Sequence, residues 1–181
     1  MDTVEGIQSN SKCILTLFWR KSNFMLMFLL EKQTTDEVTR VFEYLQKTLY
    51  EDDYKKLFQV ILTDNVHEFY DVLNIECHHK TGEVLSKVFY CDPSASWQKG
   101  GIEKNHEFIR YVLPKKTTFK NLTQNDCNII ANHINSLCRD SLNNNCPFKA
   151  MLFLCDEQTL NMLNMYYIEP DEVQLNKDLL K

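Results

Sequence analysis

Three carboxylate side chains occupy positions from which they could hold metal ions: Asp2, Asp64 and Glu103. Asp64 directly follows a short, mostly apolar run, and Glu103 lies at the edge of an apolar helical pattern, so we expect both to be half buried. Partly buried carboxylates need cations. If the three converge at the edge of a sheet, they offer the oxygen ligands that Mg²⁺ prefers, as in two-metal phosphodiester hydrolysis. The alternative is that all three are ordinary solvated charges.

Basic residues cluster around Glu103, although the whole chain of 181 residues has a net charge of −5. This net charge excludes a uniformly basic nucleic-acid binder but not a single basic face. The segment 99–120 sets six basic residues against Glu103 and Glu107, and such a strip can follow phosphates. A solvated helix face followed by a lysine-rich loop is the alternative. The basic residues are Lys99, Lys104, Arg110, Lys115, Lys116 and Lys120.

Other candidate groups are less informative. Trp97 has two open interpretations: it stacks on an unpaired base or sugar, or it anchors its loop on the core. The seven cysteines are odd in number and contain no Cys-x-x-Cys pair, which indicates a reduced intracellular chain. Cys77, His78 and His79 with Cys91 fit no zinc-finger spacing.

The elements that must position these groups follow from hydrophobic periodicity. Two apolar runs, 13–19 and 24–30, flank a polar turn and predict an antiparallel hairpin covered on both faces. Thr34 and Glu37 predict a capping box at the start of a helix. A strand is expected over 57–63. A second strand is expected over 85–90, after a turn at 80–83, and residues 92–94 are expected to end it. Helices are expected from 101 to the residue before Pro114, from 123, and at 160–163.

This order of elements predicts an α/β protein with a mixed sheet flanked by helices. Length and composition favour one domain over residues 1–181, with about 140–181 as a C-terminal extension packed on it. The most apolar stretch, 13–30, is divided by Arg20-Lys21-Ser22-Asn23 into runs too short to span a membrane. With no export signal in the sequence, we expect a cytoplasmic location.

Three stretches of sequence resemble the catalytic core of bacterial insertion-sequence transposases of the DDE superfamily, which are related to retroviral integrases. The family pattern is Asp-Asn-Gly-x-Glu-Phe, followed by Asp-Pro-x-x-Ser-Trp-Gln-Lys/Arg-Gly-x-x-Glu. The corresponding stretches here are Leu62-Thr63-Asp64-Asn65-Val66-His67-Glu68-Phe69, Phe89-Tyr90-Cys91-Asp92-Pro93-Ser94-Ala95-Ser96-Trp97-Gln98-Lys99-Gly100-Gly101-Ile102-Glu103 with its continuation to Arg110, and Leu113-Pro114-Lys115. The segments around 1–6, 20–22 and 169–175 are also similar to the family, so the resemblance covers nearly the whole chain.

The resemblance implies an RNase H-like fold in which Asp2, Asp64 and Glu103 hold two Mg²⁺ ions, with Mn²⁺ as a substitute. It implies DNA partners, both transposon ends and target DNA, in a bacterial cytoplasm and nucleoid, and it leaves a homodimer open. Water would cut a phosphodiester at the element end, and the freed 3′-hydroxyl would attack another DNA phosphate. Asn65 and Glu68 would support the motif. The DNA-binding residues implied are Trp97, Lys99, Lys104, Arg110, Lys115 and Lys116.

Three departures from the family pattern leave a second interpretation open. The family's N-terminal helix-turn-helix region is expected to be lacking, and the strand that carries Asp2 is expected to be truncated and frayed. Val66 replaces the motif glycine, and a β-branched residue would be strained there if that position had a positive φ. The alternative is therefore a truncated, non-catalytic transposase remnant that keeps the fold and weak DNA binding or dimerisation.

Overall fold

The structure is a computed structural model of residues 1–181, and it describes all of them except 8–10 and 93–94. Part of the motif, Pro93-Ser94, and with it the predicted end of a strand at 92–94, therefore falls partly outside the described residues. The strands are β1 (Asp2–Glu5), β2 (Cys13–Trp19), β3 (Phe24–Leu30), β4 (Val60–Thr63) and β5 (Lys87–Tyr90). The helices are α1 (Thr35–Thr48), α2 (Glu51–Leu57), α3 (Val72–Glu76), α4 (Gly100–Val112), α5 (Gln124–Ser136), α6 (Pro147–Met151) and α7 (Glu157–Met162). None of the helices in the described ranges is long and apolar enough to cross a membrane.

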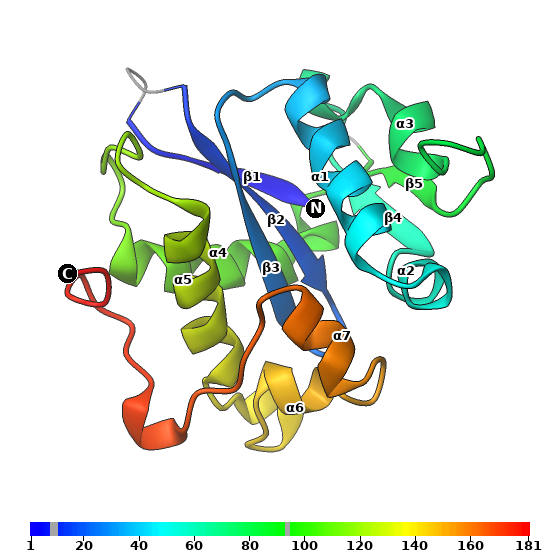
Figure 1. The fold of residues 1–181 in the computed structure, drawn as a ribbon. Coiled ribbons are helices and arrows are strands. Elements are labelled where there is room, and N and C mark those ends of the chain that lie inside the picture. The colour runs from blue at the N-terminus through cyan, green and yellow to red at the C-terminus, as the bar shows by residue number, and fades with distance from the viewer. Residues whose placement is uncertain (8–10, 93–94) are drawn as a thin grey trace.

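The β2–β3 hairpin forms the centre of the molecule (Figure 1). Its strands pair antiparallel from Cys13 opposite Leu30 to Trp19 opposite Phe24, which confirms the predicted hairpin. Asn23 in the turn has a positive φ of 54°, a conformation that asparagine tolerates better than most residues. Nearly every residue of both strands is buried, because helices cover the sheet on both sides. The apolar runs thus reflect burial on two faces.

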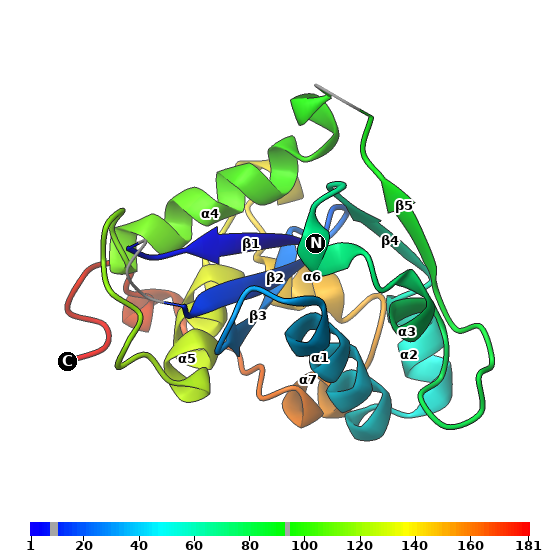
Figure 2. The ribbon, with the colours of Figure 1, turned by 90° about the horizontal axis from the view of Figure 1, so that it is seen from above.

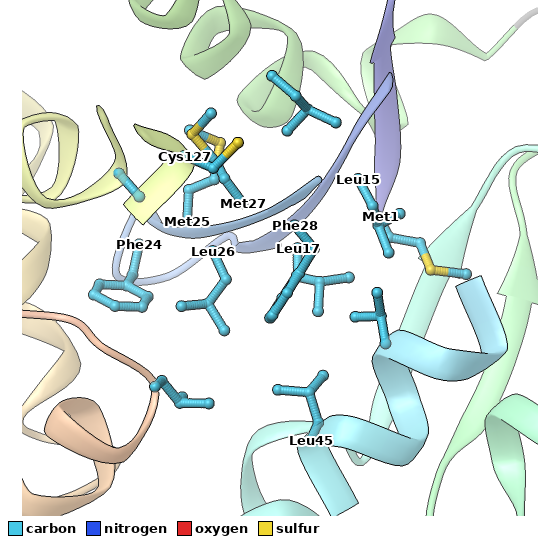
Figure 3. Close-up of a cluster of buried hydrophobic side chains, with 14 of the residues drawn as sticks. Met1, Leu15, Leu17, Phe24, Met25, Leu26, Met27, Phe28, Leu45 and Cys127 are labelled. Atoms are coloured by element: carbon cyan, nitrogen blue, oxygen red, sulfur yellow. The ribbon is translucent and has the colours of Figure 1, made fainter. Parts of the chain in front are cut away.

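The two faces of the hairpin pack against different helices (Figure 3). Leu26 and Phe28 point toward Leu45 of α1, whereas Met25 lies on the opposite side near Cys127 of α5. The alternation follows from the period of two along a strand. The hydrophobic core is therefore divided into two layers by a sheet that is itself almost entirely apolar.

The outer edge of β3 is closed by side chains of α5 in place of a further strand. The Asn135 side chain accepts a hydrogen bond from the Met25 N–H at 2.9 Å and donates one to the Met25 carbonyl at 2.8 Å. Gln124 pairs in the same way with the Leu29 N–H and the Met27 carbonyl, both at 2.8 Å. These amides satisfy backbone groups that would otherwise be left open at the sheet edge.

The remaining strands form a mixed α/β arrangement, as predicted, but the sheet is divided in two. β1 pairs antiparallel with β2, and β4 pairs parallel with β5, so the described residues form one sheet of three strands and one of two. The two sheets meet where the Met1 nitrogen donates a hydrogen bond to the Leu62 carbonyl at 2.5 Å. Asp2 lies in the ladder opposite Thr16, so the expected fraying at Asp2 is not seen.

Two local predictions are corrected by the structure. The strand expected over 57–63 begins only at Val60, because Glu51–Leu57 form α2, whose acidic first turn and basic last turn suit the helix dipole. Thr34 precedes α1 but makes no capping hydrogen bond with its side chain, and Glu37 instead accepts from the Glu31 N–H and pairs with Arg40. A capping box is found instead at the start of α5, where Thr123 pairs with Asp126.

All seven cysteines are free, and they differ strongly in exposure. Cys138 is exposed, whereas burial raises the pKa of both Cys13 and Cys127 to about 12. Because the thiolate is the reactive form, we expect Cys138 to react fastest with an aromatic disulfide reagent at pH 8, and Cys13 and Cys127 to react only on unfolding. Stopped-flow thiol titration checks this, and a fast phase that survives Cys138→Ser would contradict it.

Candidate active site

Asp2 and Asp64 meet on the two sides of the junction between the sheets. Asp2 is the first residue of β1, and Asp64 directly follows β4. The Met1–Leu62 hydrogen bond brings these strand ends together, and the Thr63 hydroxyl donates to the Met1 carbonyl at 3.4 Å. The Thr3 N–H donates to Asp2 Oδ1 at 2.9 Å and fixes that carboxylate against its own strand.

A single cation bridges these two carboxylates. Lys99 Nζ lies 3.0 Å from Asp2 Oδ1 and 2.6 Å from Asp64 Oδ2. Its side chain is only 8% exposed. Burial alone would lower the pKa of Lys99, but the hydrogen bonds and negative charges of Asp64 and Asp2 outweigh it and raise that pKa above the ordinary value. The ammonium group is therefore charged at neutral pH.

Helix α4 lies along β1 (Figure 2), and its side chains contact residues of β1 and β2 near Asp2. His106 Nε2 is 2.9 Å from the Thr16 hydroxyl, and its Nδ1 is 3.8 Å from Asp2 Oδ2. Burial lowers the pKa of His106 to about 4, so the ring is neutral at pH 7. Further along the helix, Arg110 donates to the Glu5 carbonyl at 2.9 Å.

Glu103 is not brought together with the two aspartates. It lies on α4 four residues after Lys99, is exposed, and its backbone N–H bonds to the Lys99 carbonyl at 3.2 Å. Within the described ranges, no three or more His, Cys, Asp or Glu side chains are grouped closely enough to hold a metal ion. The arrangement is therefore a pair of carboxylates, Asp2 and Asp64, that share the Lys99 ammonium group. The third carboxylate, Glu103, lies about one helical turn after Lys99.

The residues of the Asp64-Asn65-Val66 motif adopt a relaxed turn. Val66 has φ −116° and ψ 155°, an extended conformation that any residue adopts, so its replacement of glycine causes no strain. Glu68 is only 2% exposed and accepts hydrogen bonds from the Thr3 hydroxyl at 3.1 Å and from Gln33 at 2.7 Å. It ties the segment after β4 to the residue that follows Asp2. Asn65 is exposed.

The residues expected to contact DNA divide into two groups. Trp97 is 73% exposed, so its ring does not anchor the loop on the core. Three of the basic residues are also exposed: Lys104, Lys115 and Lys116. Lys99 and Arg110 differ, because they are partly or fully buried and bonded to Asp2, Asp64 and Glu5.

Sequence reasoning missed three partners of this site. Thr16 and His106 were not singled out from the sequence, and Lys99 was expected to contact DNA. Their patterns carry no signal for these roles, apart from the spacing of Lys99 four residues before Glu103 on one helical face.

A cavity of about 260 Å³ lies next to Lys99, lined mainly by apolar side chains that include Phe18, Phe58 and Ile102.

Comparison with known proteins finds transposases and a proposed integrase. The chain is 38% identical over 56 residues to the transposase of insertion sequence element IS30A from Escherichia coli K12, and 32% identical over 65 residues to the transposase of IS1086 from Cupriavidus metallidurans. It is 29% identical over 143 residues, or 79% of its length, to ORF3 of a Spiroplasma virus, a proposed integrase. The chain is a distant homologue of insertion-sequence transposases. No protein-family profile matches it.

The matches cover only part of this transposase homologue and only part of each relative. They cover 31% of the chain against the IS30A protein and 36% against the IS1086 protein. In the relatives they span 15%, 19% and 42% of the IS30A, IS1086 and ORF3 proteins, respectively. The matched part thus corresponds to a segment of each relative.

Proposed function

We propose that this chain is the catalytic core of a DDE-type transposase, with an RNase H-like fold, that cuts and joins DNA with divalent metal ions. The observation that carries the proposal is the convergence of Asp2 and Asp64, which are far apart in sequence, on one cation at 3.0 and 2.6 Å. Distant homology to transposases and to a proposed integrase supports the same chemistry.

The carboxylates fit a hard divalent cation. Their oxygens already converge on the Lys99 ammonium, which stands in for a positive ion, and carboxylate oxygens are the ligands that Mg²⁺ and Mn²⁺ accept. Asp2 and Asp64 would hold the ions, with Glu103 as the third ligand. When bound, such ions lower the pKa of an attacking hydroxyl group or water and stabilise the leaving oxygen of a phosphodiester.

The chain's own residues would orient the reacting groups. The Thr3 N–H holds Asp2, and buried Glu68 joins β1 to the segment that follows Asp64. Exposed Trp97 would stack on an unpaired base. Lys104, Lys115 and Lys116, all exposed, would contact DNA phosphates. Lys99 and Arg110 would join them only after leaving their present partners.

The proposal is tested by Asp64→Asn in a DNA cleavage assay. We expect the unaltered chain to nick a labelled DNA duplex in Mg²⁺ or Mn²⁺ and not in EDTA. Asp64→Asn should reduce the rate by at least about 100-fold, because it removes a metal ligand needed for charge stabilisation in the transition state. Asp52→Asn is the matched control, since Asp52 is exposed on α2.

Nicking that persists in Asp64→Asn would overturn the assignment. Retained DNA binding without nicking by the unaltered chain would instead favour a non-catalytic remnant. The observation that favours this second function is the absence, among the described residues, of a three-carboxylate group.

A further inference from the structure

We propose that Lys99 is a built-in counter-ion of the site, which occupies the cation position between Asp2 and Asp64 and is exchanged for the metal ion. This inference rests on the proposed function, because it requires that a divalent ion binds these two aspartates. It adds that the metal-free protein has its own occupant of the site. Metal binding is then a competition between two cations for the same oxygens.

The geometry makes the two occupants mutually exclusive. Lys99 Nζ contacts one oxygen of each carboxylate, Asp2 Oδ1 at 3.0 Å and Asp64 Oδ2 at 2.6 Å. An ion bound by both carboxylates needs oxygens at about 2.1 Å, so it would lie where the ammonium now lies. An ammonium group left in contact with that ion would also repel it. Lys99 therefore has to leave before the ion binds both aspartates.

The surroundings of Lys99 show that the contact is built in and not a surface encounter. The Lys99 side chain is 8% exposed, although the carboxylates that it joins are more open, with 23% of the Asp2 side chain and 45% of the Asp64 side chain exposed. Lys99 is the N-cap residue that precedes α4, and its carbonyl accepts hydrogen bonds from the Ile102 and Glu103 N–H groups, so its backbone is fixed. Partly buried carboxylates that face each other need such a cation. Without Lys99 or a metal ion, Asp2 and Asp64 would repel each other across the junction.

The exchange predicts opposite effects of one substitution on two measurable quantities. Lys99→Met keeps the length and apolar stem of the side chain but removes the ammonium group. In EDTA it leaves two facing carboxylates without a counter-ion, so the protein should melt at a lower temperature. In the presence of metal it removes the competitor, so the ion should bind more tightly. A lysine that merely supported the local structure would weaken metal binding when replaced.

The experiment measures Mn²⁺ binding by titration calorimetry and electron paramagnetic resonance, on the full chain freed of metal with EDTA. We expect Lys99→Met to tighten the dissociation constant for Mn²⁺ by about tenfold or more. We expect its melting temperature in EDTA to fall by at least about 3 °C, and saturating Mn²⁺ to restore it. Lys47→Met is the matched control, because it also removes one cation from an ion pair, Lys47–Glu43 at 3.0 Å, on an exposed helix face.

The Mn²⁺ affinities of the variants decide whether the exchange and the proposed function hold. Unchanged or weaker Mn²⁺ binding in Lys99→Met would overturn the exchange, as would an equal tightening in Lys47→Met. If Lys99→Met does not fold in EDTA, Lys99→Gln, which keeps a neutral hydrogen-bond donor, takes its place under the same criteria. Asp64→Asn separates the two proposals: if its Mn²⁺ affinity equals that of the unaltered chain, the ion does not bind here, and the proposed function fails together with the exchange. If Asp64→Asn loses Mn²⁺ and Lys99→Met does not gain it, only the exchange fails.

Discussion

Glu103→Gln is expected to lower the rate of metal-dependent DNA cleavage by at least about 100-fold while leaving the melting temperature unchanged. The rate should fall because an amide cannot replace a carboxylate as a negatively charged ligand of Mg²⁺. Stability should be preserved because Glu103 is exposed, and exposed substitutions of this kind usually change the free energy of unfolding by less than about 0.5 kcal/mol. Cleavage rates on a labelled duplex and thermal unfolding followed by circular dichroism measure both quantities.

Glu107→Gln provides the comparison for this experiment. Glu107 is exposed on α4, one turn after Glu103, and carries the same charge. Both substitutions therefore remove one negative charge from the same helix face, and only the loss of a metal ligand separates them. Equal activity in the two variants would show that the third carboxylate predicted from the sequence is not Glu103. Equal inactivity would indicate that charge on α4, and not a ligand, controls cleavage.

Asn135→Leu is expected to destabilise the protein by about 3 kcal/mol. Leucine has the same number of side-chain heavy atoms and the same branching as asparagine, but it leaves the buried Met25 N–H and carbonyl without partners. Each unsatisfied buried backbone group costs about 1–3 kcal/mol, and the added apolar surface recovers only part of this. For a chain of this size, the melting temperature should fall by roughly 6–12 °C.

Urea unfolding at equilibrium measures this loss, with Asn125→Leu as the control on the same helix. Asn125 is exposed, so the change there removes an amide without opening the sheet edge. A loss of less than about 1 kcal/mol in Asn135→Leu would mean that water or another side chain satisfies Met25 in its place. Concentration-dependent association of the variant would point to the open edge of β3 pairing with another chain.

The central elements could be predicted from the sequence because their signals are local. The runs 13–19 and 24–30 are too apolar for a half-exposed sheet and too short for buried helices, so the hairpin between them follows directly. Helix α4 ends at Val112, before Leu113 and Pro114, since the residue preceding a proline avoids the helical region.

Elements defined by tertiary context were not predictable in the same way. The strand expected over 57–63 loses its first residues to α2, because the apolar side chains of Leu57 and Phe58 pack equally well at the end of a helix. Thr34 and Glu37 have the spacing of a capping box, but Glu37 finds Arg40 and the Glu31 N–H instead. Spacing alone does not settle such competition between nearby partners.

The candidate site was likewise only partly predictable from the sequence. Asp64 was singled out because it follows an apolar run, and Asp2 by its place near the start of the sequence and by family resemblance; the structure brings both to one cation. That the cation is Lys99 depends on the position of α4 along β1, a long-range arrangement with no period in the sequence. The role of Glu103 as a ligand stays a prediction.

The division of the sheet between β1 and β4 has a consequence for how the molecule opens. Asp2 belongs to the three-stranded sheet with the buried hairpin, and Asp64 to the smaller β4–β5 pair, whose strands are more exposed. Units of this kind exchange their amide hydrogens and unfold locally with different free energies. The two carboxylates therefore belong to different sheets, and a cation that binds both, as Lys99 does, links the two sheets. We therefore expect the loss of that cation to increase local opening of the β4–β5 pair relative to the core, which amide hydrogen exchange measures.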